Sequence, residues 1–464
     1  MHINDFRGRR VHMIGIGGSS MSGLAAMLVD RGYGVTGSDR DDGYLLGDLR
    51  RQGIKITISH HADSVHGADL VVYTAAVAPD NPERTEAERL GIPLMERSTL
   101  LAQLMDDRPV RIAVCGTHGK TTTTSMLSQI LVEGGLDPSV HIGGKLDAIG
   151  GSSRIGRGRT FVAEACEFQR SFLEMNPTVA VVLNIDRDHL DCYRDLDEIE
   201  QTFGIFMSKV PPDGVVIGNG DDMRCRRQME ALRQPKQYFG LDGGSDWTAR
   251  AICEDEDGCV SFLLCCKFAD PVRVKLEVPG RIQVYNALAA VAAAYVGGAD
   301  IRSAVKTLER FHGAHRRFER TDIADGVEIY HDYGHNPAEM STALEIAKKR
   351  CRGRLFAVMQ PHTFSRVRAL FEDYLVCTRI ADITLVTDFC AAREKDPGDL
   401  NSGMLVEGMR RHGIAAEWTP SFDDTEKYLR EHWQPGDLVL TMGCGDIYRL
   451  NDLIHSHQVE RECK

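Results

Sequence analysis

A short glycine-rich segment between an apolar run and a helix-like run constrains this sequence more than any other feature. The apolar run 112–115 is typical of a buried strand, and the run 125–133 is typical of a helix. Between them the chain contains Gly116-Thr117-His118-Gly119-Lys120-Thr121-Thr122. Glycines let backbone N–H groups face an anion at a helix N-terminus, a lysine meets terminal phosphates, and a following hydroxyl can ligate Mg²⁺. The sequence therefore predicts an ATP site.

The spacing of this loop is tighter than usual. The position six residues before Lys120 is Val114 rather than glycine, which makes the loop two residues shorter than the common nucleotide loop. An ordinary strand-to-helix turn is the alternative interpretation. The combination of strand, glycines, lysine and threonine favours the ATP site.

A second glycine-rich turn lies near the start of the chain. The expected strand 11–16 leads into a turn with three glycines, then a helix, then a strand that ends on Asp39. This order is typical of a dinucleotide-binding unit, in which the acidic residue contacts a ribose hydroxyl. Ser20 stands where the third glycine of that fingerprint is expected. The pattern leaves NAD and other diphosphate compounds as alternatives.

Polar residues follow two expected strands in the middle of the chain. The run 160–164 ends on Glu164, and the run 179–184 ends on Asn184, with His189 a few residues later. Since ligands bind beyond the carboxyl ends of parallel strands, we expect these residues near the phosphate loop, where Mg²⁺ needs oxygen ligands. A capping or core role is the alternative for His189. Asn286, before the alanine-rich helix 287–296, either caps that helix or contacts a base.

The pattern of strands and helices indicates three domains. Strands at 327–331, 355–359, 382–386 and 437–441 alternate with helices and form a third doubly wound unit. We therefore expect an α/β protein whose three domains each contain a Rossmann-like or doubly wound, mostly parallel sheet. The expected domains are residues 1–107, 108–312 and 313–464.

Composition excludes several classes of protein. The net charge of −12 argues against nucleic acid as the main partner. The thirteen cysteines include no C-x-x-C pair, which favours reduced thiols in the cytoplasm. The N-terminus leads directly into a strand without a visible secretory signal, and the small-apolar run 287–299 is too short for a bilayer. We expect a cytoplasmic monomer or homodimer with no membrane insertion.

Several motifs, in their order along the chain, resemble those of the Mur ligase family. The resemblance extends from about residue 10 to residue 455. The motifs are the loop 116–122, Glu164-Ala-x-Glu167, Asn184-Ile-Asp-x-Asp-His189-Leu-Asp191, Tyr285-Asn286-Ala, Arg317-Phe-Glu and Asp332-Tyr-Gly-His335. Narrower matches are the turn 15–23, Asp80-Asn-Pro-Glu83, Gln360-Pro-His362 and Gly443-x-Gly-Asp446.

The resemblance implies a reaction and a division of labour among the domains. It implies a UDP-sugar domain, a central ATPase domain and a C-terminal amino-acid domain, in that order. The narrower matches imply that the lactyl carboxylate of UDP-N-acetylmuramate attacks ATP and that L-alanine then displaces phosphate from the acyl phosphate. Lys120 and Mg²⁺ would bring these like-charged reactants together. The turn at Gly15 has no lysine, which suits a diphosphate.

The resemblance also implies roles for single residues near the phosphates. Thr121 and Glu164 would hold one Mg²⁺, and Glu164 with His189 a second. Arg317 and His335 would lie at the phosphates. The expected catalytic residues are Lys120, Glu164, His189, Arg317 and His335.

Further residues are expected to bind the two nucleotides. Asn286 and Asp332 would contact the nucleoside of ATP, and the rest of the ATP site is the loop 116–122. The expected contacts of the UDP-sugar are Gly15, Gly17, Gly18, Ser19, Met21, Asp39 and Thr74.

Three positions depart from the family pattern. His331 and Cys166 stand where the family more often has Asp, and Asn336 replaces the second histidine of a His-His pair.

Three other functions are alternatives. They are a recycling ligase that uses a preformed murein peptide, an NAD-dependent oxidoreductase that rests on the first glycine turn, and a non-catalytic nucleotide-binding regulator.

Overall fold

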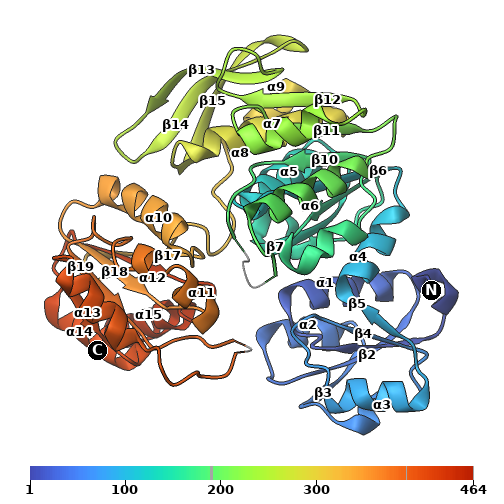
Figure 1. The fold of residues 1–464 in the computed structure, drawn as a ribbon, viewed down its shortest axis with the longest axis horizontal. Helices are drawn as coiled ribbons and strands as arrows, with labels where there is room; N and C mark the ends of the chain where they lie inside the picture. The colour runs from blue at the N-terminus through green and yellow to red at the C-terminus, as the bar shows by residue number, and fades with distance from the viewer. Residues whose placement is uncertain (189–191, 393, 463–464) are drawn as a thin grey trace.

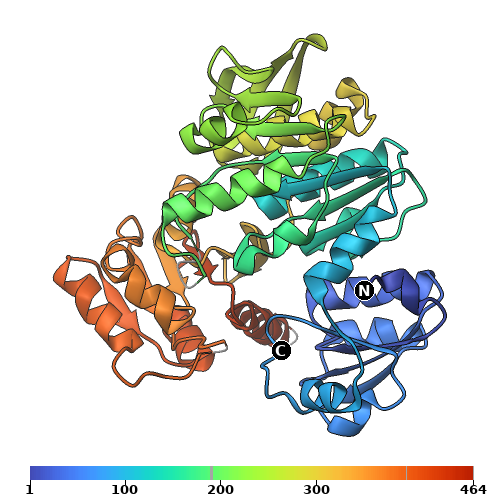
Figure 2. The ribbon, with the colours of Figure 1, turned by 45° about the vertical axis from the view of Figure 1, so that its right-hand side comes forward.

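Three lobes follow one another along the chain, and each is built around its own β-sheet (Figure 1). The computed structural model describes residues 1–188, 192–392 and 394–462. In Figures 1 and 2 the central lobe lies above the N-terminal and C-terminal lobes, which stand beside each other beneath it. The predicted α/β class with mostly parallel sheets is confirmed.

The N-terminal lobe contains a five-stranded parallel sheet. Its elements are β1 (Arg10–Ile14), α1 (Ser19–Asp30), β2 (Gly34–Asp39), α2 (Tyr44–Arg51), β3 (Lys55–Ile58), β4 (Leu70–Tyr73), α3 (Pro82–Leu90), β5 (Leu94–Glu96) and α4 (Arg97–Asp106). The strand order is β3-β2-β1-β4-β5. Consecutive residues of β1 and β4 are buried because helices cover both faces. Since the first glycine turn directly follows β1, it lies at the carboxyl edge of the sheet, where α/β proteins bind ligands.

The central lobe contains a ten-stranded sheet in the order β15-β14-β13-β12-β11-β10-β6-β9-β7-β8. The strand before the phosphate loop, β6, pairs in parallel with β10 and β9 at the middle of the sheet. The strands are β6 (Val110–Cys115), β7 (Ser139–Leu146), β8 (Gly151–Arg154), β9 (Thr160–Glu164), β10 (Val179–Val182), β11 (Val215–Asn219), β12 (Lys236–Gly240), β13 (Trp247–Glu254), β14 (Cys259–Cys266) and β15 (Ala269–Pro279). The helices are α5 (Lys120–Glu133), α6 (Leu196–Ser208), α7 (Met223–Glu230), α8 (Ile282–Val296) and α9 (Ile301–Leu308).

Antiparallel strands at both edges of this sheet were absent from the sequence prediction. Strands β13, β14 and β15 extend one edge, and β7 and β8 form the other. The run 272–278 alternates apolar and charged residues, which is typical of a strand with one solvated face. The buried face of these strands packs against α8, whose alanines 287–294 are fully buried. None of the described helices combines the length and apolarity that a bilayer crossing needs.

The C-terminal lobe contains a six-stranded sheet in the order β16-β17-β21-β18-β19-β20. Four strands match the predicted segments to within one residue, whereas the edge strands β16 (Glu319–Ala324) and β20 (Ala416–Trp418) were not predicted. The other strands are β17 (Val327–Asp332), β18 (Leu355–Met359), β19 (Ile383–Val386) and β21 (Leu438–Met442). The helices are α10 (Pro337–Arg350), α11 (Phe364–Ala369), α12 (Phe371–Tyr374), α13 (Ser402–Arg411), α14 (Phe422–His432) and α15 (Tyr448–Glu462).

The hydrophobic core does not stop at the first domain boundary. One cluster of buried side chains runs from Met13 of the N-terminal sheet through Leu101 and Met105 of α4 to Phe161 and Phe172 of the central lobe. The buried clusters of the C-terminal lobe, on the two faces of its sheet, are separate from this core in the described chain. The first two lobes therefore share apolar packing that the third does not.

Candidate active site

The phosphate loop connects β6 to α5 at the carboxyl edge of the central sheet. Its glycines have left-handed backbones, with φ of +143° at Gly116 and +82° at Gly119. A Cβ at Gly119 would lie 2.6 Å from the side-chain oxygen of Asn286, so the position requires glycine. The N–H of His118 donates to the side-chain oxygen of Asn184 at 2.8 Å. These contacts give the loop one defined shape.

The first turn of α5 carries unpaired backbone N–H groups. No described side chain caps this helix at Gly119, and its first backbone bond runs from the N–H of Thr123 to the oxygen of Gly119 at 2.9 Å. The N–H groups of Lys120, Thr121 and Thr122 have no acceptor among the described residues. Unpaired donors at the positive end of a helix dipole suit an anion, so the loop fits the phosphates of ATP.

Lys120 is held inside the loop as a charged group. Its Nζ donates to the backbone oxygens of Gly116 (2.6 Å) and Thr117 (2.9 Å) and to the Glu167 carboxylate (2.9 Å). Burial disfavours the ammonium, but the charge and hydrogen bond of Glu167, together with the neighbouring Glu164, outweigh burial and raise the pKa of Lys120 above its usual value. The predicted phosphate-binding lysine is therefore positively charged at any physiological pH.

Two of the three predicted metal ligands lie side by side. The hydroxyl of Thr121 donates to Glu164 Oε1 at 3.1 Å, and Glu164 Oε2 accepts the N–H of Gly143 at 2.8 Å. His189 lies outside the described residues, and across the described ranges no three His, Cys, Asp or Glu side chains gather as a metal site. A hydroxyl and a carboxylate oxygen fit Mg²⁺, which usually takes its other ligands from phosphate and water.

Arg317 brings the C-terminal lobe to the phosphate loop. Its Nη2 donates to Thr121 Oγ1 at 3.1 Å, and its guanidinium lies 4.7 Å from the ring centre of Tyr333. Asp332 shapes this segment, because its carboxylate accepts the backbone N–H groups of Phe318 (2.8 Å) and Gly334 (2.7 Å). Burial raises the pKa of Asp332. The structure thus places Arg317 beside the phosphate loop, and both Asp332 oxygens serve the local fold.

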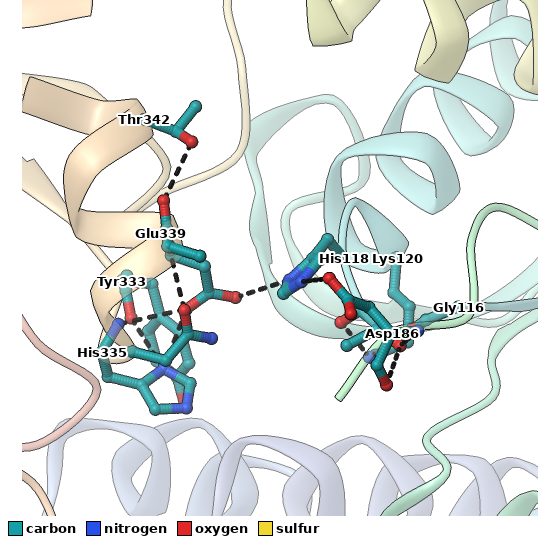
Figure 3. A network of polar contacts seen from close by, with 12 residues as sticks. Gly116, His118, Lys120, Asp186, Tyr333, His335, Glu339 and Thr342 are labelled. Atoms are coloured by element: carbon teal, nitrogen blue, oxygen red, sulfur yellow. Dashed lines mark hydrogen bonds and ion pairs between the residues drawn. The ribbon is translucent and has the colours of Figure 1, made fainter. Parts of the chain in front are cut away.

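A histidine of the loop pairs with a glutamate of the C-terminal lobe (Figure 3). His118 Nδ1 lies 3.2 Å from Glu339 Oε1, and His118 Nε2 lies 3.9 Å from Asp186. Burial opposes the charged form of His118, but the hydrogen bond and charge of Glu339 outweigh it and raise the pKa of His118. Burial likewise opposes ionised Glu339, and His118 with His335 holds the pKa of Glu339 below its usual range. The two lobes therefore meet through an ion pair at the loop.

The predicted phosphate contact His335 belongs to the same network. Its N–H donates to Glu339 Oε2 at 3.1 Å, and burial lowers the pKa of its ring. Asn336, the replaced histidine, caps α10, because its side-chain oxygen accepts the N–H of Glu339 at 3.0 Å. His331 is buried beside Thr441 (2.9 Å), and burial lowers its pKa to about 3. These two departures thus have local structural roles.

Asn286 is also part of the loop's surroundings. The helix α8 begins at Ile282, so Asn286 lies inside it and the capping alternative is wrong. Its side-chain oxygen accepts the hydroxyl of Thr123 at 3.2 Å, and its amide donates to Gln283 at 2.9 Å. This buried amide fixes the distance between α8 and the loop.

The first glycine turn presents a second uncapped helix. Gly17 donates its N–H to Asp39 Oδ2 at 2.7 Å, so the predicted ribose ligand also holds the turn. Helix α1 begins after Gly18 and has no side-chain cap among the described residues. Thr74 approaches Gly15, where a Cβ would lie 3.4 Å from its methyl group. Met21 is buried in the core, so its side chain packs within the domain.

The mismatch at Ser20 has a structural explanation. Its hydroxyl lies 2.8 Å from His141 Nε2 on β7 of the central lobe and accepts a hydrogen bond from Arg97 Nη1 at 3.1 Å. The hydroxyl of Ser152 on β8 donates to the backbone oxygen of Ser19 at 2.7 Å. The third glycine of the dinucleotide fingerprint is thus replaced by a residue that joins two lobes.

A cleft of about 620 Å³ separates the carboxyl edges of the N-terminal and C-terminal sheets. Arg40 and Asp41, just after β2, line one side, and Cys390, Ala392, Gly445, Asp446 and Arg449 line the other. The turns with Gly116 and Gly15 and this cleft bring all three lobes to one region.

Three residues of the site, Glu339, His141 and Arg97, were missed in the sequence. Only Glu339 had a signal, because it is the third residue of a helix capped by Asn336.

This arrangement defines a multidomain α/β protein with two uncapped glycine turns at domain junctions, which suit the phosphates of nucleotides. Three family descriptions match it: "Mur ligase family, catalytic domain" over residues 10–109, "Mur ligase middle domain" over 114–294, and "Mur ligase, glutamate ligase domain" over 316–445. The chain belongs to the Mur ligase family.

Similar proteins cover nearly the whole chain. A UDP-N-acetylmuramate–L-alanine ligase of Caldanaerobacter subterraneus is 44% identical over 97% of this chain and 98% of its own length. One of Acetivibrio thermocellus is 42% identical over 96% and 95%. Among solved structures, a UDP-N-acetylmuramate-alanine ligase of Thermotoga maritima matches with a TM-score of 0.83 at 26% identity, over 98% and 100%. A murein peptide ligase of Psychrobacter arcticus matches with 0.75 at 25% identity, over 97% and 98%.

Proposed function

We propose that the chain is an ATP-dependent ligase that joins L-alanine to the lactyl carboxylate of UDP-N-acetylmuramate. Support comes from the names of relatives that are 42% to 44% identical over almost the full chain. The observation that carries the proposal is the 3.1 Å contact between Arg317 and Thr121. It brings a guanidinium of the C-terminal lobe next to the phosphate loop, as a reaction between ligands of different domains requires.

Two steps account for the chemistry. A carboxylate oxygen attacks the γ-phosphorus of ATP, the bond to the ADP oxygen breaks, and an acyl phosphate forms. The amine of L-alanine then adds to the acyl carbon, phosphate leaves, and one proton passes to water. A free carboxylate is a poor acylating group. Transfer of the phosphoryl group makes one of its oxygens a good leaving group.

The residues at the loop suit the charge that develops in the first step. Lys120 and Arg317 are positioned to stabilise negative charge on the transferring phosphoryl group. Thr121 and Glu164 would hold Mg²⁺, which would neutralise phosphate charge when bound. The family resemblance adds four residues to the proposal. His189 would bind the metal, and His335 the phosphates. Asn286 and Asp332 would contact the nucleoside.

Each lobe has its own ligand in this proposal. Residues 1–107 bind the UDP-sugar at the turn that lacks a lysine, residues 108–312 bind ATP, and residues 313–464 bind L-alanine. Gly15, Gly17, Gly18, Ser19, Met21, Asp39 and Thr74 are the proposed sugar-nucleotide contacts, Met21 through its backbone. We also propose cytoplasmic action, because ATP is available there and free thiols stay reduced.

The test is ADP release by the purified protein. ADP should form only when ATP, Mg²⁺, UDP-N-acetylmuramate and L-alanine are all present, and mass spectrometry should find the alanyl product. A parallel reaction replaces L-alanine with the tripeptide L-alanyl-γ-D-glutamyl-meso-diaminopimelate. Faster turnover of the tripeptide would assign a recycling ligase instead, and no ADP under any combination would assign a non-catalytic regulator.

A further inference from the structure

Arg97 lies between the two glycine turns. It is the first residue of α4, directly after β5, and is half-buried. Its Nη1 donates to the hydroxyl of Ser20 at 3.1 Å, which places the guanidinium beside the first turn of α1. Cys166, two residues beyond the end of β9, is among the groups that act on it electrostatically. Cys166 also acts on Lys120, so Arg97 and the phosphate loop share a neighbouring group.

The positive charge of Arg97 has no ionised partner in direct contact. Throughout the described chain, the Ser20 hydroxyl is its one hydrogen-bond partner, and no carboxylate forms an ion pair with it. Glu96, its neighbour in sequence, accepts the hydroxyl of Ser98 at 3.0 Å instead. Arg97 therefore differs from Lys120, whose ammonium contacts Glu167 at 2.9 Å.

The histidine that shares the Ser20 hydroxyl with Arg97 is neutral. Burial, together with the charge of Arg97 itself, lowers the pKa of His141 to about 3, so this histidine is uncharged. Desolvation also lowers the pKa of Arg97, so an anion at this position would offset the cost of the partly buried charge.

Arg97 can reach a ligand. Some described side-chain nitrogens are fully buried and have no hydrogen-bond partner. No nitrogen of Arg97 belongs to this group. Its unpaired N–H groups therefore face solvent space, and a planar guanidinium with free donors binds carboxylates in a bidentate manner. The uncapped N-terminus of α1 beside it adds positive potential.

The location indicates which anion binds. This step rests on the proposed function, in which the sugar's diphosphate lies at the Gly15 turn and its carboxylate must reach the phosphate near Lys120. We propose that Arg97 binds this reacting carboxylate and selects sugar nucleotides that carry an acidic arm. Arg97 is then a substrate-binding residue that orients the carboxylate for attack, whereas the diphosphate is held by the turn itself.

The experiment compares two sugar nucleotides that differ only in the lactyl arm. Binding of UDP-N-acetylmuramate and of UDP-N-acetylglucosamine is measured by calorimetry on the full-length wild type, Arg97→Ala and Arg97→Lys. We expect Arg97→Ala to weaken binding of the muramate by roughly 10- to 100-fold, the value of a hydrogen bond to a charged group, and to leave the glucosamine nearly unchanged. Arg97→Lys keeps the charge but not the two parallel N–H donors of the guanidinium, so it should lose less affinity for the muramate than Arg97→Ala.

A matched control removes the same charge elsewhere in the domain. Arg9 is exposed just before β1, at the opposite edge of the sheet from the turn, and Arg9→Ala should change neither affinity. In turnover assays, Arg97→Ala should raise the KM for the muramate and leave the affinity for ATP unchanged. If Arg97→Ala does not fold, as judged by its melting temperature, the Arg97→Lys comparison decides.

Three results would overturn the inference. They are an equal loss for both sugar nucleotides, which would place Arg97 at the diphosphate, an unchanged affinity for the muramate, or a wild type that does not distinguish the two compounds. The proposed function fails separately, because it predicts ADP release by the wild type. A wild type that favours the muramate through Arg97 but releases no ADP would refute the ligase and keep the carboxylate site.

Discussion

The phosphate loop lies between two domain junctions that differ in chemistry. Towards the N-terminal lobe the first turn of α1 makes neutral contacts, between Ser20 and His141 and between Ser152 and Ser19, above a continuous apolar core. The ion pairs of this junction, Arg157 with Asp30 and Arg111 with Asp106, involve the last residues of α1 and α4 instead. Towards the C-terminal lobe the contacts carry charge. Figure 3 shows the pair of His118 with Glu339. Arg317 also reaches the loop, where it donates to Thr121.

This difference shows which parts of the molecule respond to conditions. Apolar packing and neutral hydrogen bonds depend little on salt and pH. Ion pairs weaken when salt screens the charges and when a pH change neutralises one of the two partners. We therefore expect the first two lobes to behave as one body, and the attachment of the third to depend on charge. Four experiments on the loop and its two junctions are described from the largest expected effect to the smallest.

Lys120→Ala should abolish turnover. Its charge is needed at the transferred phosphoryl group, and loss of one preorganised donor costs at least about 100-fold in rate. Rates of ADP release and melting curves measure the effect, with the exposed Lys306→Ala as a control in the same lobe. A variant with a near-normal rate and an unchanged melting temperature would remove Lys120 from the site.

Glu339→Gln should separate the charged junction from the neutral one. The variant keeps the size of the side chain but removes the ion pair to His118, and we expect about a tenfold lower kcat/KM for ATP. The wild type should lose activity as salt rises, and the variant should respond less. The same salt dependence in both proteins would show that this pair does not hold the third lobe.

Glu164→Gln should raise the Mg²⁺ concentration that gives half the maximal rate. Glutamine lacks the charge that attracts the cation, and Glu164 adjoins Thr121 at the charged junction. We expect a shift of several-fold, and a comparable shift for His189→Ala. If the magnesium titration of both variants equals that of the wild type, these residues are structural.

The smallest effect concerns stability against pH, compared between Glu339→Gln and Ser20→Ala. Because the pKa of His118 is raised, its pair with Glu339 contributes fully below the ordinary histidine value of about 6.5 and is lost as pH rises through the raised pKa. The stability cost of Glu339→Gln, a shift of about 2 °C, should therefore fall with rising pH. The cost of Ser20→Ala should stay constant, because the pKa of His141 is about 3. Melting temperatures between about pH 5 and 9 decide this, and parallel curves for the two variants would contradict the comparison.

The sequence predicted those features that local patterns encode. The loop 116–120, the Glu164 carboxylate next to it and four strands of the C-terminal sheet follow from apolar runs, glycines and the rule that parallel strands end at one edge. The strands at 247–279 were missed although the run 272–278 alternates, because they extend the sheet by antiparallel pairing, which the expected alternation of strands and helices does not contain.

The remaining site residues depend on contacts that no local pattern contains. Ser20 counted only as a mismatch, because its partner His141 lies 121 positions away. Glu339 pairs with a histidine 221 positions away. Such pairs are set by how whole domains pack, which periodicity and turn chemistry do not specify. The predicted roles of Asn286 and Asp332 towards the nucleoside stay predictions.

The contact of Asn286 with the phosphate loop also affects how the protein is made. The loop packs against Leu183 and Asn286, and the bond from Thr123 to Asn286 spans 163 residues. At about 5 to 20 residues per second, a ribosome needs roughly 10 to 30 s to synthesise that stretch. During this interval the glycines, lysine and threonines have been synthesised but lack their contact with Asn286. A growing chain therefore completes the proposed ATP site late, when most of the central lobe has been translated.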